Sequence, residues 1–221
     1  MESSLGVNDL THYLRTLLGT FFPDKLPVTE QFPTWVAMAL DRLEHCFGKA
    51  AHPRYNRGGQ AVFNHLYSDH CLVYFWFLAN TVWREGGGPE LSSKLYYLNK
   101  ILHGFDCAPD TGLPDIFLVF HGSGTVLGKA KYSDYFVSLQ GCTVGSHHGK
   151  YPTIGRGVAL TAHSGLIGDC VVGDRVSVGC GAMVFGRNID HDTTVFRDSG
   201  GKLNFRPAGV PYAQQFFTDQ L

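Results

Sequence analysis

The sequence predicts an α+β protein in which an α-helical front half is followed by a β-solenoid. Aliphatic residues recur at every sixth position in the second half, at Ile154, Leu160, Leu166, Val172, Val178 and Val184. A helix repeats its buried face every ~3.6 residues and a strand every ~2, so this period fits neither. A short strand, a corner and another short strand, repeated, would produce it. We place the two domains at residues 1–104 and 105–221.

Small residues at fixed positions in each hexad also predict the solenoid. The fifth position, near the corner, holds Val158, Ser164, Cys170, Val176 and Ala182, and the second is glycine at Gly155, Gly173 and Gly179. Corners leave little room for side chains, so glycine suits them. Three hexads make one triangular coil, and we expect the first residue of each to point into the prism. Leu127 and Val144 are one residue out of register, which predicts an irregular corner, and irregularities in a repeat often mark the site.

Residues 1–104 have helical spacing of apolar side chains. Helices are predicted near residues 10–18 and over 35–47, 62–83 and 90–103, with proline and glycine between them. The apolar run Cys71–Trp83 is shorter than the ~18 residues that crossing a bilayer requires, so it is predicted to be a buried helix. No secretory signal is visible at the start, which makes the cytoplasm the expected location.

Charge and cysteine content exclude several classes of function. Eighteen Lys and Arg residues face nineteen Asp and Glu residues, for a net charge of −1, without a basic run that would indicate nucleic acid or an anionic membrane as partner. The six cysteines form no CxxC pair and no paired metal spacing. We interpret them as structural and expect no zinc or other metal.

Two segments resemble the serine O-acetyltransferases, hexapeptide-repeat acyltransferases with a left-handed parallel β-helix. In that family an Asp-x-His-Pro segment precedes the catalytic histidine of a His-x-x-Gly segment by fifteen residues. Asp106 and His121 have this separation, within Asp106-Cys-Ala-Pro109 and His121-Gly-Ser-Gly124. Ala108 replaces the intervening histidine. The resemblance covers both the helical front and the solenoid.

The resemblance implies that His121 is the general base and that Asp106 orients it. An alcohol attacks a thioester at neutral pH only if a base takes its proton, and imidazole has a suitable pKa. A carboxylate on the far ring nitrogen would fix the tautomer. The alternatives are a hydrogen-bonded turn histidine at His121 and a helix cap or turn residue at Asp106. Cys142 as an acyl carrier is disfavoured because its neighbours offer no base.

The acceptor would be held by the polar segment around His147, His148, Lys150 and Tyr151. In the resembled family this segment ends Arg-His-Pro-x-Ile-Gly, and its Arg and His hold the amino acid; here Lys150 and Tyr151 take those positions. Lysine keeps the charge but loses the bidentate grip on a carboxylate, and tyrosine is neutral. The identity of the acceptor is therefore open. A solvated loop is the structural alternative.

The resemblance implies acetyl-CoA as the donor, lying in a groove between neighbouring solenoids and hence a homotrimer or a dimer of trimers. The matching corner positions are Ala162, Ser164, Gly181 and Ala182. The alternative is that these residues are structural corners only. The segment Ala208–Pro211 resembles the closing loop of the family. Four basic residues in the segment before it are candidates for phosphate binding or simple solvation: Arg187, Arg197, Lys202 and Arg206.

We therefore predict an acetyl-CoA-dependent O-acetyltransferase acting on serine or a similar small hydroxylated acceptor. One alternative is a sugar O- or N-acetyltransferase of envelope polysaccharide synthesis. The other is a non-catalytic trimeric scaffold built on the same solenoid.

Overall fold

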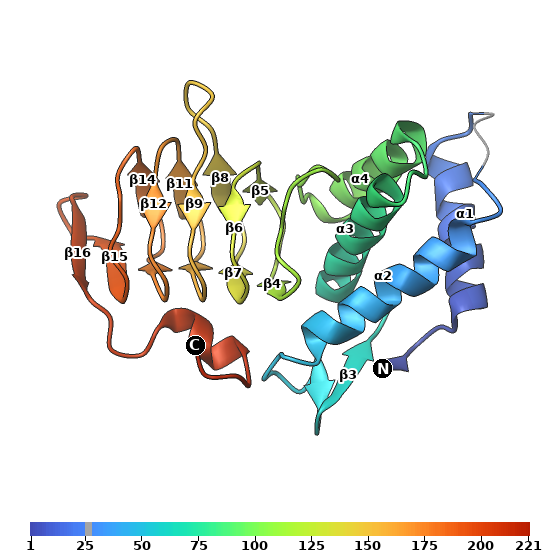
Figure 1. Cartoon of the computed structure of the whole chain (residues 1–221), viewed down its shortest axis with the longest axis horizontal. Coiled ribbons are helices and arrows are strands. Elements are labelled where there is room, and N and C mark those ends of the chain that lie inside the picture. The colour runs from blue at the N-terminus through green and yellow to red at the C-terminus, as the bar shows by residue number, and fades with distance from the viewer. Residues whose placement is uncertain (25–27) are drawn as a thin grey trace.

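The computed structural model describes residues 1–24 and 28–221, with a helical region at one end and a solenoid at the other (Figure 1). The helices are α1 (Val7–Phe21), α2 (Phe32–Phe47), α3 (Ser68–Arg84) and α4 (Pro89–His103). Both parts of the predicted α+β architecture, including the left-handed β-helix, are confirmed. Within the described ranges, no helix combines the length and apolar character that crossing a bilayer requires.

Helix α3 is the buried centre of the helical region, as its apolar sequence predicted. Its residues from Asp69 to Val82 are buried without interruption. The predicted start at residue 62 was wrong, because Gln60–Phe63 form strand β3, which pairs with β1 (Glu2–Ser3) and β2 (Asn56–Arg57). This strand has no polar–apolar alternation, because Ala61, Val62 and Phe63 are all buried, so nothing in its sequence separates it from a buried helix. The helix therefore begins at Ser68, beside the first coil of the solenoid.

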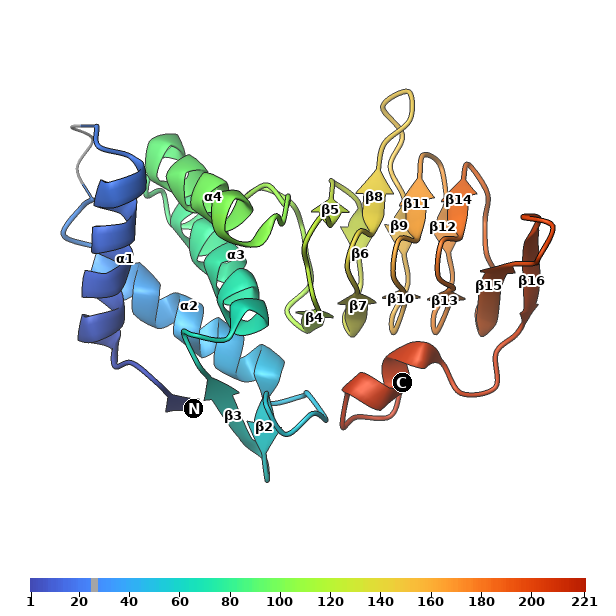
Figure 2. The same ribbon diagram turned by 180° about the vertical axis from the view of Figure 1, so that it is seen from behind.

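The solenoid has three parallel faces, seen from both sides in Figures 1 and 2. The first contains β4 (Phe117–Val119), β7 (Phe136–Ser138), β10 (Ala159–Leu160), β13 (Ser177–Val178) and β15 (Thr193–Arg197), to which β16 (Leu203–Pro207) adds antiparallel. The second contains β5 (Val126–Leu127), β8 (Thr143–Gly145), β11 (Gly165–Ile167) and β14 (Met183–Phe185). The third contains β6 (Lys131–Tyr132), β9 (Thr153–Ile154) and β12 (Val171–Val172). The β15–β16 hairpin lies at the end of the prism.

The hexad interpretation is confirmed by burial. All six first-position residues are at most 2% exposed, and the five fifth-position residues are at most 1% exposed. Leu127 pairs with Val144, so the irregular register is real. One residue is missing between the second and third faces: Leu127 and Tyr132, which pair with Val144 and Ile154, are five residues apart, whereas Leu166 and Val172 are six apart. Separately, an insertion precedes β5, because six residues connect β4 to β5 where four connect β7 to β8. A second insertion follows β8, where seven residues lead to β9 but three lead from β11 to β12.

The carboxyl-terminal segment runs from the hairpin back along the solenoid to the helical region (Figures 1 and 2). It contains the 3-10 helix η1 (Tyr212–Phe216). The amide of Ala51 donates to the carbonyl of Phe216 at 2.8 Å, and the Phe216 ring lies 4.8 Å from that of Phe120. This segment therefore joins the end of α2 to the turn that carries His121.

Truncating a first-position residue should open a cavity in the prism. We expect Leu166→Ala, at 0% exposure, to lower the free energy of unfolding by about 2–5 kcal/mol. Leu66→Ala removes the same atoms from a side chain that is 80% exposed, and should change it by less than about 0.5 kcal/mol. Urea denaturation of the two variants measures the difference, and equal losses would contradict the hexad assignment.

Candidate active site

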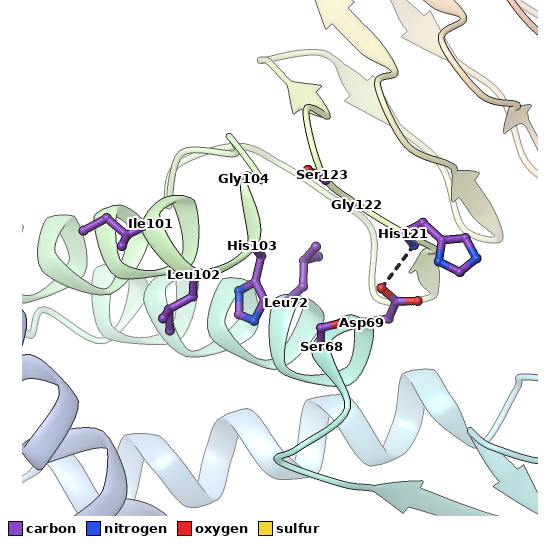
Figure 3. A pocket seen from close by; sticks show the side chains of 10 residues that line it. All are labelled: Ser68, Asp69, Leu72, Ile101, Leu102, His103, Gly104, His121, Gly122 and Ser123. Atoms are coloured by element: carbon purple, nitrogen blue, oxygen red, sulfur yellow. Dashed lines mark hydrogen bonds between the residues drawn. The ribbon is translucent and has the colours of Figure 1, made fainter.

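A cavity of about 490 Å³ lies where the helical region meets the first coil of the solenoid (Figure 3). Three segments line it: the first turns of α3, the end of α4, and the turn between β4 and β5. The lining residues are Ser68, Asp69, Leu72, Ile101, Leu102, His103, Gly104, His121, Gly122 and Ser123. The cavity thus combines one carboxylate, two imidazoles and two hydroxyls with an apolar wall.

His121 lies on the insertion between β4 and β5 and has left-handed backbone geometry, with φ of 53°. This conformation costs a residue other than glycine about 1–2 kcal/mol. Its backbone N–H donates a hydrogen bond to Oδ1 of Asp69 at 3.1 Å, which helps to hold the strained turn. The insertion between β4 and β5 therefore carries the predicted base into a cavity, whereas the irregular corner predicted from the sequence lies further along the chain, between Leu127 and Val144.

The same turn is packed tightly against α3. A Cβ placed on Gly122 would lie 2.3 Å from Cδ1 of Leu72 and 2.9 Å from Cγ1 of Val119. Leu72 is itself buried in the core. Glycine is needed here because the turn approaches the helix too closely for any side chain.

The Asp106 carboxylate forms hydrogen bonds with side chains of α4 and not with the His121 ring. Its Oδ1 accepts from the hydroxyl of Tyr96 at 2.6 Å, and its Oδ2 accepts from Nζ of Lys100 at 2.6 Å. Burial alone would raise the pKa of Asp106, but these two donors outweigh it and lower the pKa. This arrangement differs from the expected contact with the far ring nitrogen, because α4 supplies both donors before the chain reaches the solenoid.

The carboxylate beside His121 is Asp69, which the sequence analysis did not single out. Asp69 is 4% exposed, and burial raises its pKa, partly offset by the His121 amide and the charge of His121. It stands one residue into a long apolar helix, where an acidic side chain ordinarily completes the first turn. The sequence feature that could have indicated Asp69 as a site residue is an acidic side chain in the first turn of a helix that is otherwise apolar and buried.

His103 gives the cavity a second imidazole, which is neutral near pH 7. Burial lowers its pKa to about 4, although a hydrogen bond to Asn99 acts in the opposite direction. Its Nδ1 lies 2.7 Å from Oδ1 of Asn99, and the Asn99 amide donates to the carbonyl of Leu72. His103 is therefore fixed to α3 and α4 as an uncharged wall of the cavity.

The predicted acceptor segment forms a tight hairpin at a different corner of the coil, after β8. His147 and Lys150 exchange backbone hydrogen bonds of 3.0 Å in both directions, and His148 is left-handed with φ of 50°. Nζ of Lys150 lies 2.7 Å from Oδ2 of Asp169, and Tyr151 is 46% exposed. The hairpin follows β8 and projects from the prism in Figure 1, whereas His121 lies on the connection between β4 and β5. Within one chain these residues and His121 occupy separate corners.

The predicted donor-binding residues divide into two groups. Ser164 and Ala182 are fully buried in the prism, so their side chains face away from any ligand outside it. Ala162 and Gly181 lie at the outer side of the corner between the first and second faces, and the Gly181 amide donates to the Ala162 carbonyl at 3.0 Å.

The remaining candidates have structural partners. Cys142 is buried, and its Sγ donates to the carbonyl of Thr161 at 3.1 Å. The guanidinium groups of Arg187 and Arg206 lie over Phe205 and Phe196, at 4.0 Å and 5.1 Å from the ring centroids. Cys180 is the exposed member of the six cysteines, so burial does not explain it as it does the others. Across residues 1–24 and 28–221, no cluster of three or more His, Cys, Asp or Glu side chains is arranged to hold a metal.

Comparison with known proteins gives this arrangement a context. The sequence is 31% identical over 112 residues to a serine acetyltransferase of Synechococcus elongatus, a match that spans 48% of this chain and 46% of that protein. This chain resembles the serine acetyltransferases. The match with this chain therefore covers less than half the length of the Synechococcus protein. No family model matches the sequence.

Solved structures show the same fold. The serine acetyltransferase of Neisseria gonorrhoeae aligns with a TM-score of 0.68 at 18% identity, over 98% of this chain and 86% of that one. A serine acetyltransferase in complex with CoA aligns with a TM-score of 0.58 at 14% identity, over 90% and 95% of the two chains. Identities this low support the fold, and the chemistry rests on the residues of the cavity.

The depressed pKa of His103 should make the protein less stable in mild acid. The unfolded imidazole titrates near pH ~6.5 and the folded one at about 4, so the unfolded state binds more protons between those values. The stability contributed by neutral His103 is therefore present above pH ~6.5 and is lost as the pH falls toward 4.

His103→Gln should flatten this dependence, because an amide does not titrate. We expect the drop in free energy of unfolding between pH 7 and pH 4 to be smaller in the variant by on the order of 1–3 kcal/mol. Urea titrations at several pH values measure it. An unchanged drop would show that His103 is not buried in its neutral form.

Proposed function

We propose that the protein is an acetyl-CoA-dependent O-acetyltransferase that acts on serine or a similar small hydroxylated acceptor, with His121 as the general base. The observation that carries the proposal is that the repeat insertion places His121 beside a carboxylate in a cavity of about 490 Å³. The likeness to named serine acetyltransferases supports the type of reaction. A scaffold would not require this cavity to hold an imidazole and a carboxylate together.

The proposed chemistry is direct transfer. A neutral ring nitrogen of His121 takes the proton of the acceptor hydroxyl as its oxygen attacks the thioester carbonyl carbon. The tetrahedral intermediate then expels the CoA thiolate, the C–S bond breaks, and the imidazolium returns the proton to sulfur. Atoms and charge balance without a covalent enzyme intermediate or a metal. Gly122 and the contact with α3 would hold the imidazole in place throughout.

The donor would lie along the outer corner that carries Ala162 and Gly181. A single prism offers no deep groove for a long flexible ligand, so we propose that a second copy of the chain completes the groove in a homotrimer or dimer of trimers. The likeness to a serine acetyltransferase in complex with CoA supports the donor. The same assembly would bring the hairpin of one copy, with His148, Lys150 and Tyr151, toward the His121 of another.

One observation favours a second acceptor class. Lys150 is paired with Asp169 at 2.7 Å, and Tyr151 is neutral, so the hairpin offers little free positive charge for an amino-acid carboxylate. A neutral acceptor such as a sugar hydroxyl would need none. A sugar O- or N-acetyltransferase of envelope polysaccharide synthesis is therefore the alternative that the acceptor panel below tests.

Removing the base should abolish transfer. We expect His121→Ala to lower kcat by about 10²–10⁴-fold, because a positioned general base contributes this much to proton abstraction. Release of CoA thiol, measured with acetyl-CoA and a panel of serine and sugars, monitors the reaction. His12→Ala, on an exposed face of α1, is the matched control and should be unaffected. Turnover retained in His121→Ala would exclude His121 as the base, and no turnover with any acceptor would favour a scaffold.

Lys150 separates the two acceptor classes. If it holds the carboxylate of serine, Lys150→Ala should raise the KM for serine by about ten- to a hundredfold and change kcat little, because a charge-assisted hydrogen bond of roughly 1.5–3 kcal/mol is lost. Steady-state kinetics on the best acceptor measures the effect. A KM unchanged by the substitution would point to an acceptor without a carboxylate.

A further inference from the structure

The cavity contains a carboxylate that the resemblance does not account for. Asp69 comes from α3 in the helical region, far in sequence from the Asp106–His121 pair that resembles the family. It is nearly buried, at 4% exposed, and yet it lines the same cavity as His121. Burying an ionised carboxylate costs solvation free energy unless hydrogen bonds or an opposite charge compensate for it. The position of Asp69 in the cavity therefore suggests that the residue has a function there.

The contacts of Asp69 are directed at His121. One carboxylate oxygen accepts from the His121 backbone N–H at 3.1 Å, and the charge of His121 acts to lower the pKa of Asp69. In Figure 3 the dashed line joins the Asp69 carboxylate to the backbone nitrogen of His121, and the imidazole of the same residue extends beyond that hydrogen bond. Within the described ranges, Asp69 has no ion-pair partner, so its negative charge is available to His121.

Asp106 is in the opposite situation. Both of its oxygens are occupied by donors from α4, at 2.6 Å each, and one of these donors is the cation of Lys100. The positive charge of Lys100 therefore offsets most of the negative charge of Asp106, which weakens any electrostatic attraction between Asp106 and the His121 imidazole. Asp106 also pairs with Val126 through the backbone, which fixes it to the start of the coil.

We propose that Asp69, rather than Asp106, is the positioning residue of His121. The backbone hydrogen bond holds His121 in its left-handed conformation, and the carboxylate stabilises the imidazolium that forms when the acceptor proton is taken. Asp69 does not itself exchange a proton with the acceptor. The base and its positioning carboxylate thus come from the two different parts of the chain. This inference rests on the proposed function for its kinetic consequences, although the electrostatic coupling can be measured independently.

The kinetic test compares two isosteric substitutions. Asp69→Asn keeps an oxygen that can accept from the His121 amide and removes the charge, so the fold should be retained. We expect kcat/KM to fall about ten- to a hundredfold, mostly in kcat. The acidic limb of the pH–rate profile should move to lower pH, because the imidazolium loses its neighbouring negative charge. Asp106→Asn should lower kcat/KM less than about threefold and leave the profile in place.

A second measurement needs no turnover. The side-chain carboxyl carbons of Asp69 and Asp106 are followed by NMR as the pH is varied, in the native protein and in His121→Gln. We expect the midpoint of Asp69 to rise in the variant, because the attraction of the charged imidazole is gone, and that of Asp106 to stay within about 0.2 pH units. His12→Gln is the control and should move neither.

The outcomes separate the two proposals. An unchanged Asp69 midpoint, or a larger kinetic effect from Asp106→Asn than from Asp69→Asn, overturns the role of Asp69. If every acceptor fails but the Asp69 midpoint still responds to His121, the proposed acetyl transfer is wrong while the coupling stands. If Asp69→Asn loses activity without the shift of its pH profile, its role is structural support alone, and the proposed electrostatic role is also overturned.

Discussion

The candidate site depends on one contact, the seating of the β4–β5 turn against the first turn of α3. A hydrogen bond from the His121 amide to Asp69 and the absence of a side chain at Gly122 allow the turn to lie directly on the helix. Without that contact the turn would be an exposed loop with a strained residue at its tip. With it, a histidine is fixed between the helical region and the solenoid, whose buried residues form one continuous hydrophobic cluster.

The solenoid is a rigid framework, and its two insertions place the candidate site residues at particular corners of that framework. Each coil repeats the same buried residues, so the faces leave little freedom in where a corner lies. Two corners break the repeat, and each of them carries side chains that the chemistry would use. The first brings His121 to the helical region, and the second extends His147–Lys150 outward as a hairpin. The fold thus presents the base and the acceptor segment at two separate corners, which adjacent copies of the chain could bring together.

The structure could be predicted from the sequence in the solenoid, where a six-residue period determines which side chains are buried. The hexads place Leu160 and Val178 inside the prism because any other register would expose them to water. The sequence was also sufficient to find His121, because the fifteen-residue separation from Asp106 and the glycines that follow His121 resemble the segments of a known family. It could not find Asp69, because the contact between α3 and the β4–β5 turn depends on how the helical region packs on the solenoid, and no local sequence pattern encodes that packing. For the same reason it could not foresee that Lys100 and Tyr96 engage Asp106: helical spacing places both on α4 but does not say what lies beyond its end. The early start expected for α3 failed because a four-residue apolar strand looks like one more turn of helix.

The return of the carboxyl-terminal segment has a consequence for biosynthesis. Phe216 packs against Phe120, the residue that precedes His121, and its carbonyl is bound by Ala51 at the end of α2. During translation, the helices and the turn that carries His121 are synthesised before Phe216. Until that segment folds back, a nascent chain would have the His121 turn seated against α3 but would lack the Phe216 ring against Phe120 and the hydrogen bond to Ala51.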